Sequence, residues 1–192
     1  MAQRLILAAF LGALVLSVGA AENPAVLIRT EKGDITVEID LSRAPITAAN
    51  FLRYVDAGLY DGTVFHRTVT LSNQPTDPVR IEVIQAALLP AEKCFPPIAH
   101  ETTDDTGLWH IEGTVSMARS RPGSAASSFF FCIGPQPALD FGGRRNPDGQ
   151  GFAAFGRVIR GMEVVRAIHA SPADGQRLDP PVKIVSVRRI DT

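Results

Sequence analysis

Three consecutive phenylalanines, Phe129 to Phe131, are the feature that most constrains how this chain can fold. Successive side chains of a β-strand point to opposite faces, so three rings in a row cannot all enter a core that covers one face only. Either protein covers both faces of this strand, or one ring lines an apolar pocket. The run therefore predicts a strand at residues 128–133 and favours a site for an apolar ligand group beside it.

The N-terminus is typical of a secretory signal peptide. Arg4 precedes an apolar run at residues 5–18, and small residues follow at 19–21. An uncleaved membrane anchor is the competing interpretation, but the run is shorter than the ~20 apolar residues that span a bilayer. We expect cleavage after Ala20 or Ala21 and a location in the periplasm.

Residues 1–21 are thus assigned to the signal peptide, and residues 22–192 to one domain of a size that suits a single core. The chain has 19 Lys and Arg against 20 Asp and Glu, with no block of like charge. This balance argues against nucleic acid or an anionic membrane surface as a partner. Because no long apolar run follows the leader, we expect a monomer without stable membrane insertion after cleavage.

The only cysteines are Cys94 and Cys132, and neither lies in a metal-ligand spacing. No metal or other cofactor is therefore predicted. In an oxidising compartment the two thiols could pair. The alternative, which we favour, is that Cys132 is a small buried apolar residue of its strand, because free cysteine is among the most buried residue types.

Short strands separated by glycine and proline dominate the rest of the pattern. A hairpin is predicted where runs at 25–30 and 35–39 flank Lys32-Gly33-Asp34. A helix with one apolar face is predicted from Ala44-Pro45 to just before Gly58. Many short strands with two helices indicate a β-barrel or sandwich. The further strands are predicted at residues 63–67, 81–87, 113–118, 152–158 and 182–190, and the second helix at 162–169.

Several motifs follow one another along the chain: RAPITAANFLRYVDAGLYDGTVFHR at 43–67, Ile84-Gln85, PPIAHE at 96–101, GTVSMAR at 113–119, SSFFFC at 127–132, Leu139-Asp140, FGRV at 155–158 and GMEVV at 161–165. In this order they resemble the motifs of the cyclophilin-type peptidyl-prolyl cis-trans isomerases, and in particular those of the exported bacterial branch. The resemblance implies a mainly β fold, a closed eight-stranded antiparallel barrel capped by two helices, and cofactor-free isomerisation of X-Pro bonds.

Isomerisation of an X-Pro bond requires only a lower barrier to rotation about a partial double bond. A suitable site holds the proline ring in an apolar pocket and stabilises the twisted amide, in which the proline nitrogen regains a lone pair. Arg67, in the motif Phe65-His66-Arg67, matches the family's catalytic arginine, although the residue alone would be assigned to a surface salt bridge. Proline-containing polypeptides are the expected partners.

The resemblance implies further roles. Gln85 matches the glutamine that hydrogen-bonds the substrate and orients the arginine. Phe130 matches the floor of the proline pocket, so its two neighbouring rings are assigned to the core. Substrate contacts are also implied for Leu139 as a pocket wall, and for Ala118 and Arg119 beside the peptide backbone.

The chain departs from the family around the same site. The segment between Arg67 and Gln85 is longer than usual, and counting back from Gln85 puts Glu82 at an aromatic position and Val83 at a methionine position. An altered pocket with weaker catalysis or changed specificity is expected, with a Glu82 carboxylate that could pair with Arg67. Three more family positions differ: Ser128 replaces a glutamine, Ala138 an aromatic residue, and Phe152 a histidine or tyrosine.

One other function is compatible with parts of the sequence. These departures would also suit a module or chaperone that binds proline-containing segments without turnover. A hydrolase is disfavoured, because no Gly-x-Ser-x-Gly motif is present.

His66 is expected to point away from Arg67, because strand neighbours alternate. His100, His110 and His169 are expected to be structural or exposed, since no metal spacing or local carboxylate and serine accompany them.

Overall fold

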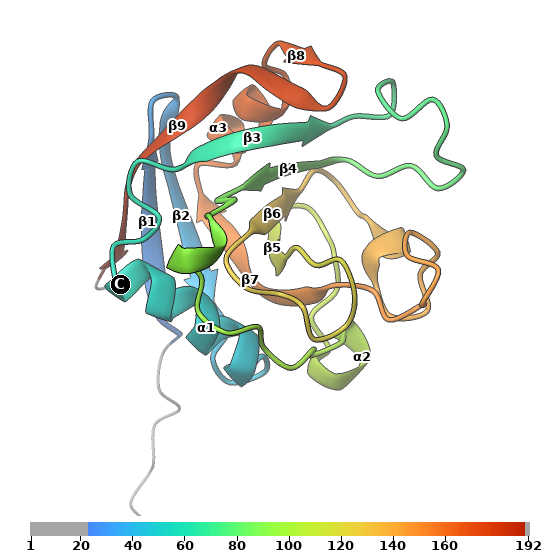
Figure 1. Ribbon diagram of the computed structural model, residues 1–192, viewed down its shortest axis with the longest axis horizontal. Helices are drawn as coiled ribbons and strands as arrows, with labels where there is room; N and C mark the ends of the chain where they lie inside the picture. The colour runs from blue at the N-terminus through green and yellow to red at the C-terminus, as the bar shows by residue number, and fades with distance from the viewer. Residues whose placement is uncertain (1–22, 191–192) are drawn as a thin grey trace, which may run out of the picture.

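Eight antiparallel strands form a closed barrel in the computed structural model, which describes residues 23–190 (Figure 1). The signal peptide predicted at 1–21 therefore lies outside the described residues. Pairing between the first and last strands of the sheet closes the barrel, so the predicted fold is confirmed. In spatial order the strands are β1 (Ala25–Thr30), β2 (Gly33–Ile39), β7 (Ala153–Arg160), β5 (Thr114–Met117), β6 (Phe129–Cys132), β4 (Val83–Ala86), β3 (Val64–Val69) and β9 (Arg177–Ile190), with the two-residue β8 (Ala173–Asp174) paired to β9.

Two helices lie on opposite sides of the barrel, α1 (Pro45–Asp56) and α3 (Met162–His169) (Figure 1). Both were predicted, and Gly58, with φ of +64°, follows the end of α1 as expected for a helix-ending glycine. A single-turn helix, α2 (Thr103–Thr106), was not predicted. Two short 3-10 turns are η1 (Ala91–Lys93) and η2 (Pro137–Leu139). No helix within residues 23–190 has the length and apolar character to cross a membrane.

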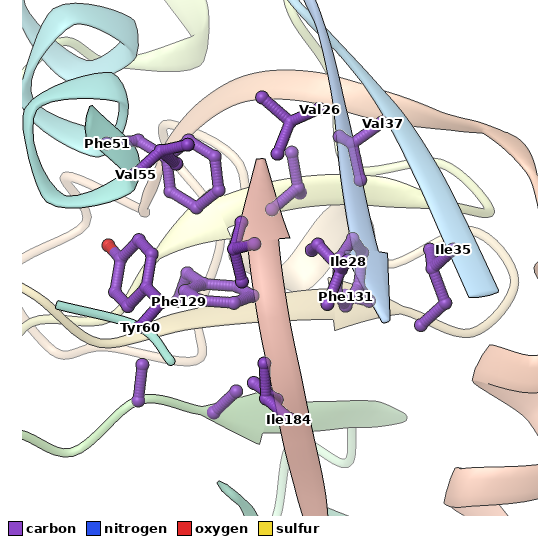
Figure 2. Close-up of a cluster of buried hydrophobic side chains, with 14 of the residues drawn as sticks. Val26, Ile28, Ile35, Val37, Phe51, Val55, Tyr60, Phe129, Phe131 and Ile184 are labelled. Carbon is purple, nitrogen blue, oxygen red and sulfur yellow. The ribbon is translucent and has the colours of Figure 1, made fainter. Parts of the chain in front are cut away.

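Apolar side chains fill the barrel interior. Figure 2 shows Phe51 and Val55 of α1 directed toward the rings of Tyr60 and Phe129. Phe51 meets Phe129 edge-on, with ring centroids 5.3 Å apart and planes at 88°, a favoured aromatic geometry. The predicted apolar face of α1 is buried here. With the interior packed in this way, a ligand has to bind on the outside of the barrel wall.

A second apolar cluster lies on the outer face of the same wall. Phe129 and Phe131 belong to the interior core, whereas Phe130 and Cys132 belong to this outer cluster. Both faces of β6 are therefore covered, as one reading of the three phenylalanines predicted. Cys132 is fully buried, and this burial raises the pKa of its thiol well above the ordinary value. Cys94 and Cys132 are both free, and the favoured interpretation of Cys132 is confirmed.

A β-bulge in β3 moves Arg67 to the outer face. Phe65 is packed in the interior core, and strict alternation would place Arg67 inside as well. The pairing of β3 with both β4 and β9 shifts register between Phe65 and Arg67. Such an extra residue reverses the facing of every later side chain in the strand. Arg67 consequently projects from the outer face, next to the outer cluster.

The first turn of α1 is capped from a distant segment. Its N-cap residue, Ala44, has no side chain that could accept a hydrogen bond. Instead the buried Glu101 carboxylate accepts from the backbone N–H of Ile46 at 3.1 Å, and from the N–H and hydroxyl of Thr47 at 2.7 and 2.6 Å. A carboxylate at this helix end also interacts favourably with the helix dipole. Glu101 thereby ties the segment before α2 to α1.

Candidate active site

A pocket of about 250 Å³ opens on the outer face of the barrel over β3, β4 and β6. It contains both apolar walls and charged or amide side chains, so it could hold a small apolar group next to a hydrogen-bond donor. Eight of the ten residues predicted for the site line it: Arg67, Val83, Gln85, Ala118, Arg119, Phe130, Leu139 and Phe152. Three further residues line it that were not predicted: Ile81, Arg145 and Asn146.

The floor and walls of the pocket are apolar. Phe130 is only 4% exposed, and the Phe152 ring meets it edge-on, with centroids 5.4 Å apart and planes at 87°. Ile81 and Val83 of the outer cluster form an aliphatic side beside them. Because these side chains pack against one another in the outer cluster, they give the pocket a fixed apolar lining.

Arg67 is held at the side of this pocket by two glutamines. Its Nη1 donates to Gln85 Oε1 at 3.0 Å, and its Nε donates to Gln176 Oε1 at 2.9 Å. Burial lowers the pKa of Arg67, and the nearby Arg145 lowers it further while Asp77 raises it. An arginine still stays charged at neutral pH. Arg67 is therefore a half-buried cation with a fixed orientation.

Ser128 acts on Gln85 and does not line the pocket. Its hydroxyl accepts from Gln85 Nε2 at 3.0 Å and donates to the carbonyl of Ala86 at 2.8 Å. These bonds fix which end of the Gln85 amide faces Arg67, since Nε2 is used by Ser128 and Oε1 is left for the guanidinium. The predicted substrate contact of Ser128 is thus replaced by a contact to Gln85.

Arg119, just after β5, is fixed against the loop that precedes β7. Its guanidinium forms a paired contact with Asp148 at 2.7 and 2.8 Å, and donates to the carbonyl of Gly151. This ion pair lowers the pKa of Asp148 to about 2. The guanidinium carbon also lies 5.2 Å from the centroid of the Phe152 ring. Arg119 therefore supports the Phe152 wall of the pocket.

The expected position of Glu82 is wrong. Glu82 is half-exposed and is absent from the residues that line the pocket, and among residues 23–190 it pairs with no cation. Val83 and Gln85 face outward, while Ile84 and Ala86 face inward. Because side chains alternate along a strand, Glu82 falls in the inward-facing set with Ile84 and Ala86, and not on the outer face that carries the pocket. Ile81, 5% exposed, occupies the pocket side instead.

His110 is buried beneath the floor and is structural, which was one of the two alternatives expected for it. His110 lies between Asp140, 2.7 Å from Nδ1, and the Ser116 hydroxyl, 3.0 Å from Nε2, and its ring stacks on Phe130 at 6.0 Å. No local spacing indicates this trio, because the barrel brings together residues from three segments. Ser116 has no exposed surface and so cannot act as a nucleophile on a peptide. The arrangement supports the pocket floor and gives no support to a hydrolase.

His66 does not belong to the site. His66 does not line the pocket, although the bulge removes the strict alternation on which its placement was predicted. Burial lowers the pKa of His66, and the Arg67 charge lowers it further. Within residues 23–190, no three His, Cys, Asp or Glu side chains gather as a metal site.

A second depression does not compete with this site. It measures about 470 Å³ and lies beside the C-terminal end of α1. Two of its lining residues, Arg188 and Arg189, form ion pairs with Asp61 and Asp56. Both cations of this depression are therefore neutralised by carboxylates, whereas Arg67 forms no ion pair with a carboxylate of residues 23–190.

The match to known proteins extends over nearly all of the described chain. Residues 25–189 match the family described as cyclophilin type peptidyl-prolyl cis-trans isomerase/CLD. The chain belongs to the cyclophilin family. Peptidyl-prolyl cis-trans isomerase A of Dickeya dadantii is 36% identical over 150 residues, which cover 78% of this chain and 73% of that protein. A peptidyl-prolyl cis-trans isomerase of Acinetobacter baylyi is 35% identical over 185 residues, which cover 93% and 92%. These relatives support isomerase activity for this cyclophilin.

Solved structures agree with this fold. A cyclophilin type isomerase of Cryptosporidium parvum superimposes with a TM-score of 0.68 at 22% identity, over 88% of this chain and 99% of that one. A crystal structure of the same protein in the presence of the dipeptide Ala-Pro gives a TM-score of 0.66. At this level of identity the likeness establishes the fold of this cyclophilin alone.

Proposed function

We propose that this cyclophilin catalyses cis-trans isomerisation of X-Pro bonds in exported proteins, with Arg67 stabilising the twisted amide. The free edge of the Arg67 guanidinium beside an apolar pocket carries the proposal. A guanidinium has five N–H groups. Three of them are used within the protein, on Nε, Nη1 and Nη2, which leaves one on each terminal nitrogen. Those two can reach a group held in the pocket.

The chemistry follows from the electronic structure of the amide. Rotation about the X-Pro bond has a barrier of ~18–20 kcal/mol, because resonance with the carbonyl must be lost. In the twisted state the proline nitrogen becomes pyramidal and can accept a hydrogen bond. Donation from Arg67 stabilises that state more than either planar state, so it lowers the barrier. A reduction of about 4 kcal/mol would accelerate isomerisation roughly a thousandfold.

The pocket supplies the other requirement, a fixed proline ring. Phe130, Leu139 and Phe152 offer apolar surface of a size suited to one pyrrolidine ring. A solved relative in the presence of Ala-Pro supports a proline-containing peptide as the substrate class. With the ring held, the carbonyl side of the bond is the part that rotates, close to Arg67.

A second candidate function is binding of proline-containing segments without useful turnover. Its motivation is the aliphatic side of the pocket, which Ile81 and Val83 form, with Val83 at a position where the family resemblance implies a methionine. Exchange NMR on a short Ala-Pro peptide tests both functions, because it reports isomerisation rate and binding in one sample. We expect catalysed cis-trans exchange at substoichiometric protein. Saturable binding with no acceleration above the uncatalysed rate would instead establish the binding module.

Export is proposed from the leader predicted at residues 1–21. We expect the protein recovered from the periplasmic fraction of an expressing bacterium to begin at Ala21 or Glu22, as measured by intact mass. Recovery of the full-length chain in the membrane fraction alone would show that the leader is an anchor.

A further inference from the structure

Gln176 is a second amide partner of Arg67, from a part of the chain that no motif singled out. It lies at the tip of the hairpin between β8 and β9, and 109 residues separate it from Arg67 in sequence. Its Oε1 accepts two hydrogen bonds from the same guanidinium, from Nε at 2.9 Å and Nη2 at 2.5 Å. Gln176 therefore holds the flank of Arg67 opposite to the one held by Gln85.

The orientation of the Gln176 side chain is fixed at both ends. Its Nε2 donates to the carbonyl of Asn73 at 3.3 Å, which directs Oε1 toward Arg67. Its own carbonyl accepts from the N–H of Thr68 at 2.9 Å. Asn73 Nδ2 in turn donates to the carbonyls of Thr68 and Gly175, each at 3.0 Å. The long segment after β3, which carries Asn73, thus lies against this hairpin, on the same side of the molecule in Figure 1.

Both amide partners are neutral, and this matters for the charge of Arg67. A carboxylate at either place would accept the same N–H groups but would also offset the positive charge on which stabilisation of the twisted amide depends. Among residues 23–190 no carboxylate forms an ion pair with Arg67. The Asp77 carboxylate raises the pKa of Arg67, but it is itself paired with Arg145 at 3.3 Å.

We propose that Gln176 is a positioning residue for isomerisation: with Gln85 it clamps the Arg67 guanidinium without neutralising it, and directs the two unused N–H groups into the pocket. The segment after β3 contributes to catalysis through Asn73, which sets the hairpin and the Gln176 amide. This inference rests on the proposed role of Arg67.

The decisive variant is Gln176→Glu, which keeps shape and hydrogen-bond acceptance but adds a negative charge. We expect kcat to fall at least ~tenfold with KM changed less than ~threefold, because the loss arises in the twisted state. Gln176→Met, which removes the acceptor, should lower kcat by about threefold to tenfold through loss of orientation. Arg177→Gln is the matched control. It makes the net charge more negative by the same amount as Gln176→Glu, at a neighbouring residue of the same hairpin whose side chain is exposed.

The Arg67→Ala background separates positioning from a structural role. There, Gln176→Glu should change the residual rate less than ~twofold, since a residue that acts only through Arg67 has no further effect. Thermal melting points of the Gln176 variants should stay near wild type. An equal kinetic loss with and without Arg67, or an unchanged kcat in Gln176→Glu, would overturn the inference. If Arg67→Ala leaves catalysis unchanged, the proposed role of Arg67 is wrong. If Arg67→Ala lowers catalysis but Gln176→Glu does not, only the role of Gln176 is wrong.

Discussion

Arg67→Ala is expected to lower kcat/KM for a short X-Pro peptide at least ~tenfold, equivalent to ~1.4 kcal/mol of transition-state stabilisation. The reason is that the guanidinium edge would be the donor to the twisted amide, while the apolar pocket that binds proline stays intact. Most of the loss should therefore appear in kcat. Exchange NMR or a coupled assay measures it, with a thermal melt to verify that the barrel is folded.

Arg144→Ala is a suitable control for this experiment. Arg144 is an exposed arginine of the loop that also carries Arg145 and Asn146, so its removal causes the same loss of charge near the pocket. We expect its kcat/KM to stay within ~twofold of wild type, because exposed charges are screened by solvent. A wild-type rate in Arg67→Ala would remove this side chain from the mechanism.

Glu101→Ala is expected to give the largest loss of stability among single polar substitutions, about 2–3 kcal/mol in the free energy of unfolding. The substitution deletes the side-chain cap that Glu101 provides at the start of α1, and it leaves the N–H groups of Ile46 and Thr47 without their acceptor. Denaturant unfolding followed by circular dichroism measures the loss.

Glu101→Gln should lose less than the alanine variant, because an amide oxygen can still accept one of these bonds. Glu163→Ala is the control: it removes an exposed carboxylate from the first turn of α3, where helix-dipole stabilisation is at most about 1 kcal/mol. Equal stability of Glu101→Ala and wild type would show that water replaces the cap without cost.

The sequence predicts the elements well because their signals are local. Pro45 and Gly58 bracket α1, and its apolar spacing defines the buried face without knowledge of the rest of the chain. The hairpin of β1 and β2 was likewise predicted, although its two-residue turn lies at Glu31-Lys32 and not at Gly33. In contrast, β9 begins at Arg177, five residues before the predicted start at 182, because pairing with β8 and β3 extends it.

The site could be predicted only where a motif carried it. Phe130 and Arg67 were named from their motifs, but the bulge that turns Arg67 outward has no glycine or other local mark. Glu82 was misplaced because its position was counted across a segment of unusual length. Such counting cannot determine which face of the strand a side chain occupies. Gln176 depends on tertiary contact alone. For Arg67 and Glu82 the unpredicted property is the face of the wall that the side chain occupies, which is decided by partners elsewhere in the chain.

The barrel wall is one β-sheet thick, and this affects which amino-acid substitutions the protein can tolerate. In β4 and β6, alternate residues serve separate purposes: Ile84, Phe129 and Phe131 pack in the interior core, while Gln85 and Phe130 line the pocket on the outer face. Substitutions of the outward-facing residues can therefore alter the shape and polarity of the pocket without changing the inward-facing residues that maintain the fold. Evolution can vary the outside of this barrel one residue at a time over a constant inside.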